Sequence, residues 1–431
     1  MTGLPASGAP AAAPRWRVRI VFIALCVGVL AGLLEGGARL WYAVRGRLSW
    51  RPRPAAAAAV GARPAPTAAE IEAAGRALDL DPYEIADLSQ PRHWRLRAGY
   101  RATVREVLDA KRREGRVLAV RYIEKRAPEL GIAPDDVAIA INDDGFRGPP
   151  LDRAHARFRI LSLGDSCTFG TFLSQEFGYP RALERELSRR GFAVEAINAG
   201  VEAYVPRNDL LRLDEFRALR PEITTIYLGW NALWGERFLE EVTRPGRALK
   251  SVRLFGEAYE RARQTFGDRN RQAIEDYARP KHPNRNAPEV RLLDAFTPSF
   301  MPDMTMIIEG MQAAGSRVVL LTLPGLYAMD EDPSPRALEI GHLPTFTDNP
   351  FVLARMAERY NEALRDLARE RGCDLIDLAG WSREALRPRD AQFLDSVHLV
   401  ETAQEKLGLH LAEALAPLLP ASARQAPAPP R

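Results

Sequence analysis

The stretch "RFRILSLGDSCTFGT", residues 157–171, decides the fold of this chain. Its apolar run predicts a strand buried on both faces, as in a parallel sheet covered by helices. The run stops abruptly at Gly164, Asp165 and Ser166, and a helix is expected to follow. Because functional groups gather at the carboxyl ends of such strands, two hypotheses arise. The stretch is either an ordinary strand-to-helix turn or a serine held at the sheet edge for nucleophilic attack.

Four further short runs are likewise dominated by aliphatic and β-branched residues. They are "VEAINAG" (194–200), "ITTIYLG" (223–229), "RVVLLTLP" (317–324) and "CDLIDLA" (373–379). Amphipathic helical patterns separate them, at 179–191, 206–220 and 351–372. This alternation predicts an α/β fold in which helices cover both faces of a parallel sheet.

The composition is that of a globular protein. The 431 residues suffice for one large or two ordinary domains, and 46% are hydrophobic and 27% charged. The net charge is only +4, and no basic face is interleaved with aromatic residues, so nucleic acid is not a predicted partner. Cys26, Cys167 and Cys373 form no metal-binding cluster, although a bridge between the last two stays open.

An apolar segment near the amino terminus predicts a membrane anchor. The uninterrupted run from Ile20 to Leu34 gives about 22 Å of helix, short of the roughly 30 Å hydrocarbon core. Extension to Val44 supplies the missing length, with Glu35 and Arg39 able to pair on one helix face. A cleaved signal peptide and a buried helix are the alternatives, but "LLEGGARL" is a poor cleavage site. Arginines flank both ends of the segment, so they do not set its orientation.

These patterns predict the following organisation. Residues 1–17 are a disordered terminus, 18–44 a transmembrane helix, 45–69 a linker, 70–136 a helical peripheral cap, 137–418 the α/β domain and 419–431 a disordered tail. Within the α/β domain, residues 232–300 break the alternation and predict a helical insertion or lid.

Three residues from opposite ends of the α/β domain form a candidate catalytic triad. A serine hydroxyl is a poor nucleophile until a base accepts its proton, and His398 titrates near neutral pH. Asp395, three residues earlier, can reach the other ring nitrogen and fix the tautomer. The sequence therefore predicts Ser166, His398 and Asp395 as nucleophile, base and orienting acid.

The same sheet edge carries candidate donors for an oxyanion. The backbone N–H of Ser166, the backbone N–H of Gly200 and the side-chain amide of Asn231 follow the first three strands. Each signal has a plain alternative, such as a turn, a helix cap or a structural histidine. Their shared position at the strand ends favours the catalytic interpretation. For Cys167, Trp230 and Trp234, packing is the favoured interpretation, and the other five histidines lack partners at ligand spacing.

The series Gly-Asp-Ser, Gly, Gly-x-Asn and Asp-x-x-His resembles the SGNH/GDSL hydrolases. The upstream "NDDGFRGP" (142–149) and the Thr-Phe-Gly after the serine are similar to the membrane-anchored bacterial branch. The resemblance covers roughly residues 140–418 and implies a flavodoxin-like, three-layer, doubly wound parallel sheet. It assigns Ser166, Asp395 and His398 to the triad and Gly200 and Asn231 to the oxyanion hole. It implies no metal and no organic cofactor.

Two positions depart from this family pattern. Many relatives carry Asp after the asparagine of the third block, where this chain has Ala232. The residues after Gly200 read "VEAY", where relatives often have a second glycine. Neither departure removes a predicted catalytic group, but Ala232 puts the support of the Asn231 loop in question.

The leading hypothesis is a membrane-anchored serine esterase with its catalytic domain outside the cytoplasm, in the periplasm. Its expected partners are the membrane and an ester-bearing small molecule, glycan or lipid, with envelope polysaccharide or lipid as the natural setting. An O-acyltransferase that passes an acetyl group to a polysaccharide hydroxyl would use the same triad. A non-catalytic anchored scaffold, supported by Ala232 alone, is the third hypothesis.

Overall fold

The computed structural model describes most of the predicted α/β domain and part of the region before it. The described residues are 83–85, 94–113, 117–170, 175–236, 238–239 and 278–424. They belong to one compact unit, Pro66–Leu239 together with Asp268–Arg431. The predicted transmembrane helix over 18–44 lies outside the described residues, as do the predicted terminus and linker. Among the helices that are described, none combines the length and apolar character needed to cross a membrane.

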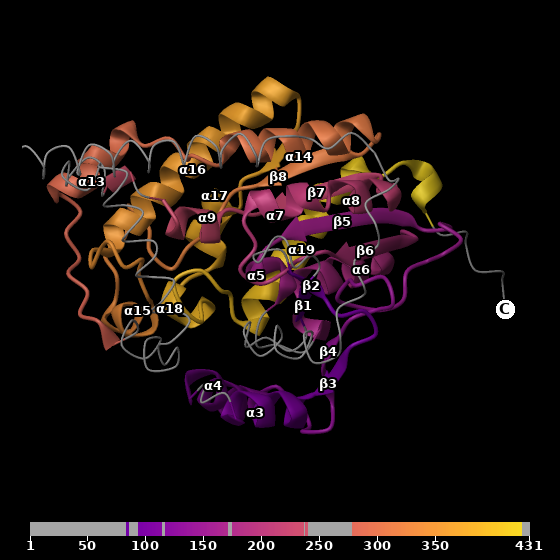
Figure 1. The fold of residues 1–431 in the computed structure, drawn as a ribbon, viewed down its shortest axis with the longest axis horizontal. Coiled ribbons are helices and arrows are strands. Elements are labelled where there is room, and N and C mark those ends of the chain that lie inside the picture. Colours follow the sequence, from indigo (N-terminus) through magenta and orange to yellow (C-terminus); the bar gives the residue numbers. More distant parts are fainter. Residues whose placement is uncertain are drawn as a thin grey trace, which may run out of the picture. The chain divides into compact units, whose positions relative to one another are not determined.

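A parallel sheet of five strands forms the centre of this unit, in the order β6-β5-β7-β8-β9 (Figure 1). The strands are β5 (Phe158–Gly164), β6 (Val194–Asn198), β7 (Ile223–Tyr227), β8 (Arg317–Leu321) and β9 (Asp374–Ile376). Each of the five predicted apolar runs contains one of these strands. The predicted parallel sheet is therefore confirmed.

Burial on both faces explains why apolar runs marked these strands. Ile160, Leu161 and Leu163 of β5 are wholly buried, and every residue of β7 is buried. Because successive side chains of a strand point to opposite faces, such continuous burial requires helices over both faces.

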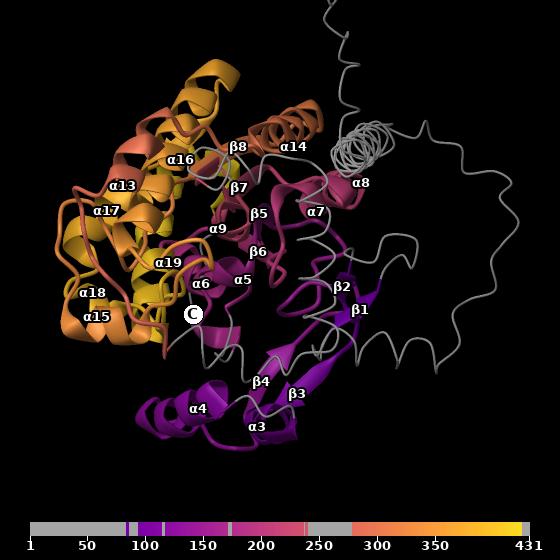
Figure 2. The same ribbon diagram turned by 60° about the vertical axis from the view of Figure 1, so that its left-hand side comes forward.

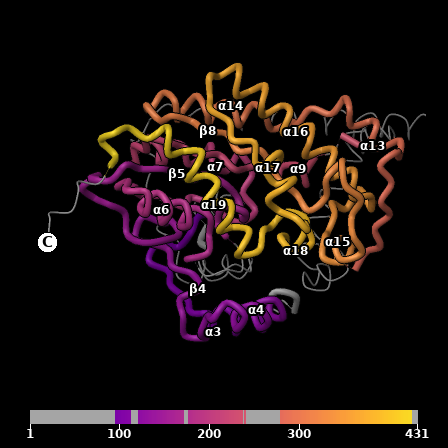
Figure 3. The backbone as a smooth tube through the Cα atoms, turned by 180° about the vertical axis from the view of Figure 1, so that it is seen from behind, coloured from indigo at the N-terminus to yellow at the C-terminus, as the bar shows by residue number. Residues whose placement is uncertain are grey.

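Helices cover the sheet on both faces. Those described after β5 are α5 (Ser166–Phe169), α6 (Tyr179–Arg189), α7 (Pro206–Leu211), α8 (Leu213–Ala218), α9 (Trp230–Trp234), α13 (Pro288–Leu292), α14 (Met301–Ala313), α15 (Pro335–Ile340), α16 (Pro350–Arg371), α17 (Leu378–Ala385), α18 (Arg389–Gln392) and α19 (Glu401–Leu415). On one face α6 packs against α19 (Figure 3). On the other, α14 contacts α7, α8 and α16 (Figure 2).

The strand order places a switch point beside β5. The chain moves from β5 to β6 on one side and then returns past β5 to β7 on the other. Since parallel crossovers are right-handed, the two connections lie on opposite faces of the sheet. Their loops diverge at the carboxyl end of β5, where such sheets bind ligands. Ser166 follows directly at this point.

The region predicted as a helical cap, 70–136, also contains strands. Two helices, α3 (Val104–Arg113) and α4 (Val117–Glu129), are accompanied by β1 (Tyr83–Ile85), β2 (Trp94–Leu96) and β3 (Arg101–Thr103). β1 pairs with β2, and β3 pairs with β4 (Val137–Ala140), both antiparallel. β1, β2 and β3 have only three residues each, shorter than the roughly four to eight over which alternation predicts a strand.

Two further predicted segments, the insertion over 232–300 and the tail over 419–431, are described only in part. Of the predicted insertion or lid, 232–300, the described part holds the end of α9, α13 and a 3-10 turn at Leu293–Ala295, whereas residues 237 and 240–277 lie outside it. The predicted tail, 419–431, begins with packed residues, because Ala423 is buried and its carbonyl accepts the Ala193 N–H at 2.7 Å.

Candidate active site

The turn after β5 is built so that only small groups fit at its start. A Cβ atom on Gly164 would lie 1.9 Å from Thr168 Oγ1 and 2.6 Å from the Tyr227 carbonyl oxygen, so glycine is required there. Asp165 caps α5, because its Oδ1 accepts the Cys167 N–H at 2.9 Å. Ser166 is the first residue of α5 and is 9% exposed. The abrupt end of the apolar run is therefore a tight strand-to-helix turn with a serine at its tip.

Ser166, His398 and Asp395 form one chain of hydrogen bonds. Ser166 Oγ lies 2.7 Å from His398 Nε2, and His398 Nδ1 lies 2.7 Å from Asp395 Oδ2. The other carboxylate oxygen of Asp395 accepts the backbone N–H groups of Val397 and His398, each at 2.9 Å. The structure thus brings the three predicted triad residues together, although 232 positions separate the serine from the histidine.

Charge and burial act in opposite directions on this pair. Burial disfavours the charged imidazole, but the charge of Asp395 and its hydrogen bond outweigh burial and raise the pKa of His398 above its ordinary value. Burial also disfavours the Asp395 carboxylate, yet the His398 charge and hydrogen bond lower the pKa of Asp395. The arrangement therefore favours a proton on Nδ1 and a stabilised imidazolium, as transfer of the serine proton requires.

Two of the three predicted oxyanion donors, Asn231 and Gly200, are held by hydrogen bonds to neighbouring residues. Asn231 Nδ2 donates to the Tyr204 carbonyl at 3.1 Å, and the Gly200 N–H donates to Asn198 Oδ1 at 3.0 Å. A Cβ atom on Gly200 would lie 2.3 Å from the Phe169 nitrogen, so this glycine lets the strand end approach α5. Because Tyr204 fixes the Asn231 amide, its orientation does not depend on a carboxylate at position 232.

The cysteine beside the serine is not activated. Burial raises the pKa of Cys167 well above its ordinary value, and Sγ contacts the Val397 carbonyl at 3.6 Å. A thiol in this state is inert as a nucleophile. Cys167 and Cys373 are both free, so the bridge left open by the sequence does not form.

Trp230 and Trp234, both predicted to be packing residues, flank Asn231 in α9. Trp230 is buried, as expected for a packing residue, and its ring meets that of Trp234 edge to face at 6.4 Å. Trp234 is only partly buried, and the centre of its ring lies 5.1 Å from the centre of the His342 ring. The backbone N–H of His342 donates to Ser396 Oγ, and the same hydroxyl donates to the His342 carbonyl. Ser396 directly follows Asp395 in the sequence. No sequence pattern predicts this contact between His342 and Ser396.

Sequence reasoning also missed three polar residues around α5. Arg147, Asn198 and Gln404 donate hydrogen bonds to backbone carbonyls of residues 167–170. From the sequence alone, "NDDGFRGP" indicates only a family resemblance and Asn198 only the end of a strand. The backbone carbonyls that these side chains bind are distant in sequence, so no local pattern could have revealed these contacts.

Comparison with known proteins gives the class and then the family. The sequence profile of the GDSL-like lipase/acylhydrolase family matches residues 162–406, more than half of the chain. Together with the parallel sheet, this match defines an enzyme of the ester hydrolase class. The chain belongs to the GDSL-like lipase/acylhydrolase family.

Solved structures resemble the fold at low identity. The TesA structure is 15% identical, with 61% of this chain and 99% of that chain covered and a TM-score of 0.35. The acetyl xylan esterase AlAXEase is 16% identical (60% and 99% covered, TM-score 0.35). The lipase/acylhydrolase from Enterococcus faecalis is 17% identical (62% and 99% covered, TM-score 0.37). No protein of curated function matches the chain.

Proposed function

We propose that the chain is a membrane-anchored serine esterase that cleaves O-acyl esters through Ser166, His398 and Asp395. Ser166 Oγ attacks the acyl carbonyl carbon while His398 Nε2 takes its proton, and His398 then donates this proton to the departing alkoxide. Asp395 holds the ring tautomer and stabilises the imidazolium. Water activated by His398 then releases the acyl group. The observation that carries the proposal is the pair of 2.7 Å contacts linking hydroxyl, imidazole and carboxylate.

Asn231 is the side-chain donor to the oxyanion in this mechanism. An amide nitrogen carries two protons, so the bond to Tyr204 still leaves one for the developing charge. The Gly200 N–H would have to share its proton between the oxyanion and Asn198 Oδ1. We therefore expect Asn231 to contribute more than Gly200 to stabilising the tetrahedral intermediate.

The anchoring part of the proposal rests on the apolar segment over 18–44. A helix of that length and composition would hold the catalytic domain at a membrane surface. A periplasmic domain held in this way would meet acyl groups of envelope polysaccharide or lipid. The proposed chemistry requires only an ester bond in the substrate. From the proposed membrane setting we assign the substrate class as an O-acylated glycan or lipid.

Hydrolysis of a panel of short- and long-chain acyl esters by the full chain tests this function. We expect turnover by the natural chain and none above background by Ser166→Ala of equal thermal stability. Equal turnover by the two proteins would overturn the proposal. With a labelled acetyl donor and an oligosaccharide acceptor, release of free acetate supports the esterase, whereas transfer of the label to the sugar would replace it with the O-acyltransferase alternative.

A further inference from the structure

The turn that carries the proposed nucleophile is very short. α5 contains only Ser166 to Phe169, and the Ser166 carbonyl accepts the N–H of Gly170, the residue that follows the helix, at 3.0 Å. The last carbonyls of a helix have to be satisfied by groups outside its own ladder, and here the carbonyls from 167 to 170 accept hydrogen bonds from side chains of other segments. The position of Ser166 therefore depends on what holds the far end of this turn.

Three side chains from three separate segments hold these carbonyls, and we call them the carbonyl clamp: Arg147, Asn198 and Gln404. Gln404 Nε2 donates to the carbonyl of Cys167 at 3.2 Å, Asn198 Nδ2 to those of Thr168 at 2.9 Å and Phe169 at 3.3 Å, and Arg147 Nη1 to those of Phe169 at 2.5 Å and Gly170 at 2.7 Å. All three clamp residues are buried. In the low-dielectric interior of a protein, hydrogen bonds are electrostatically stronger than in water.

The segment "NDDGFRGP" is shaped to deliver Arg147 to this position. Asn142 Oδ1 accepts the N–H groups of Asp144 and Phe146, both at 3.0 Å, and Asn142 Nδ2 donates to the Pro149 carbonyl at 2.9 Å. The Phe146 ring is buried. The loop is therefore closed on itself before Arg147 leaves it, and the Arg147 N–H bonds to the Asn198 carbonyl at 3.2 Å.

Arg147 is the charged member of the clamp. Besides its two bonds to α5 it donates from Nη2 to the Ala138 carbonyl of β4 at 3.0 Å, and its guanidinium lies 4.5 Å from the centre of the Phe169 ring. A planar, forked donor can hold several carbonyls at once in fixed directions, which a lysine ammonium cannot do in the same way. Arg147 thus joins the region before the sheet to the end of the nucleophile turn.

Resting on the proposed function, we propose that Arg147 is a positioning residue for Ser166. By fixing the carboxyl end of α5 it keeps Ser166 Oγ at the 2.7 Å separation from His398 Nε2 that proton transfer needs. Displacement of a reacting atom by about 1 Å costs roughly 100-fold in rate, so loss of the clamp lowers kcat without removing any reacting group. KM is expected to change little, because Arg147 lies beneath the turn and touches its backbone.

A second buried arginine supplies a matched control. Arg159, in β5, is as buried as Arg147 and also donates to two carbonyls, those of Leu219 and Asp152, at 2.6 and 2.8 Å. It lies near the start of β5, the strand that precedes Ser166. Replacement by lysine at either position disturbs a buried guanidinium, but only one of the two guanidinium groups touches the nucleophile turn.

The test compares Arg147→Lys with Arg159→Lys in the full chain, with native sites counted by complete fluorophosphonate labelling. We expect kcat per site to fall about tenfold in Arg147→Lys and about 100-fold in Arg147→Met, with KM within about threefold of the natural chain. Arg159→Lys should keep kcat within about twofold even where its thermal midpoint falls equally. The pKa of the acid limb of kcat/KM should stay unchanged in Arg147→Lys, because the Asp395–His398 pair is untouched.

The outcomes separate this inference from the proposed function. If Arg147→Lys retains the full kcat per site while its thermal midpoint falls, Arg147 only stabilises the fold and the inference is overturned, with the esterase proposal intact. If the natural chain neither turns over esters nor labels at Ser166, both are overturned. Should Arg147→Met fail to fold, the two lysine variants decide the matter.

Discussion

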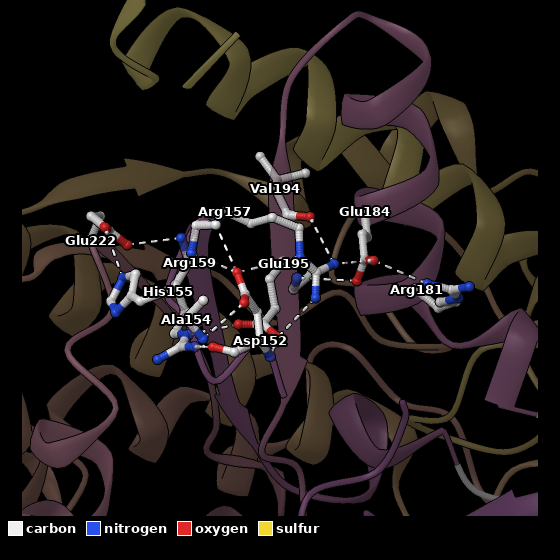
Figure 4. Close-up of polar contacts among 12 residues, drawn as sticks. Asp152, Ala154, His155, Arg157, Arg159, Arg181, Glu184, Val194, Glu195 and Glu222 are labelled. Carbon is white, nitrogen blue, oxygen red and sulfur yellow. Dashed lines mark hydrogen bonds and ion pairs between the residues drawn. The ribbon is translucent and has the colours of Figure 1, made fainter. Parts of the chain in front are cut away.

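The two ends of strand β5 differ in how completely their buried charged groups are paired. At the amino end, Arg159 Nε donates to Glu195 Oε2 at 2.7 Å, and the Arg159 N–H donates to Glu222 at 2.8 Å (Figure 4). Arg157 adds contacts with Glu195 at 3.1 Å and Glu184 at 3.4 Å. At this end the buried Arg159 of β5 is thus paired with the buried Glu195 of the neighbouring strand β6.

At the carboxyl end, two buried carboxylates are left incompletely paired. Asp165 Oδ2 and both side-chain oxygens of Asp209 have no hydrogen-bond partner among the residues that the structure describes. Burial raises the pKa of Asp165 to about 6 and raises that of Asp209 well above its ordinary value. Ser166 and His398 lie at this same end, with the hydroxyl and imidazole in contact.

This difference separates groups that stabilise the sheet from groups arranged for a reaction. Folded proteins satisfy most buried polar atoms, and exceptions gather where function requires them. The amino end follows the rule, whereas the carboxyl end departs from it around the proposed nucleophile. Changes at the carboxyl end should therefore cost activity, and changes at the amino end should cost stability.

The largest effect is expected for Asp395→Asn. Without the carboxylate, the imidazole loses the partner that fixes its tautomer and stabilises its cation, and we expect kcat to fall about 10³- to 10⁴-fold. Steady-state ester hydrolysis measures the change, and circular dichroism verifies the fold. A loss below tenfold in the folded variant would show that Asp395 does not act through His398.

Asn231→Ala should produce the next largest loss. Removal of one oxyanion donor typically lowers kcat by about 10²- to 10³-fold. Because Asn231 also bonds to the Tyr204 carbonyl, the thermal midpoint must be measured alongside kcat. Ala232→Asp is the matched control, and we expect it to leave kcat within about threefold. A normal rate in Asn231→Ala would assign the oxyanion to backbone donors alone.

At the other end of β5, Arg159→Met should cost stability instead of rate. Removing one partner of a buried ion pair costs about 3 kcal/mol or more of unfolding free energy. Urea unfolding of the full chain measures this loss, and kcat of the folded fraction is expected to stay within about twofold. A large drop in kcat at full stability would contradict the division of roles between the two ends.

The pH dependence of kcat/KM gives the smallest but most specific prediction. His398 must be neutral to accept the serine proton, so activity should rise with pH through the pKa of His398 and be lost below it. Because Asp395 raises that pKa against the effect of burial, the acid limb should move to lower pH in Asp395→Asn. An acid limb that does not move would mean that another group controls it.

The sequence predicted the sheet and the polar groups at its carboxyl edge, and for a clear reason. Runs such as 158–164 are apolar on both faces, and the carboxyl ends of parallel strands meet at one edge, so Ser166 and Asn231 could be placed near each other. His398 is predicted at the same edge because it follows the last strand and stands three residues after Asp395.

What the sequence could not predict depends on contacts between distant segments. Arg147 reaches the carbonyls of α5 through a closed loop, and the Gly200 N–H is engaged by Asn198. Neither contact follows from periodicity or local spacing. The strands at 83–85 and 101–103 are too short for an alternating pattern to be recognised.

The most direct test of the central claim is to locate a covalent adduct on the chain. A fluorophosphonate reacts with an activated serine, so peptide mapping by mass spectrometry after labelling of the full chain identifies the nucleophile. The account predicts one adduct, on Ser166, that is absent in Ser166→Ala and forms at least 100-fold more slowly in His398→Ala. An adduct on another residue, or labelling of Ser166 at an equal rate without His398, would contradict it.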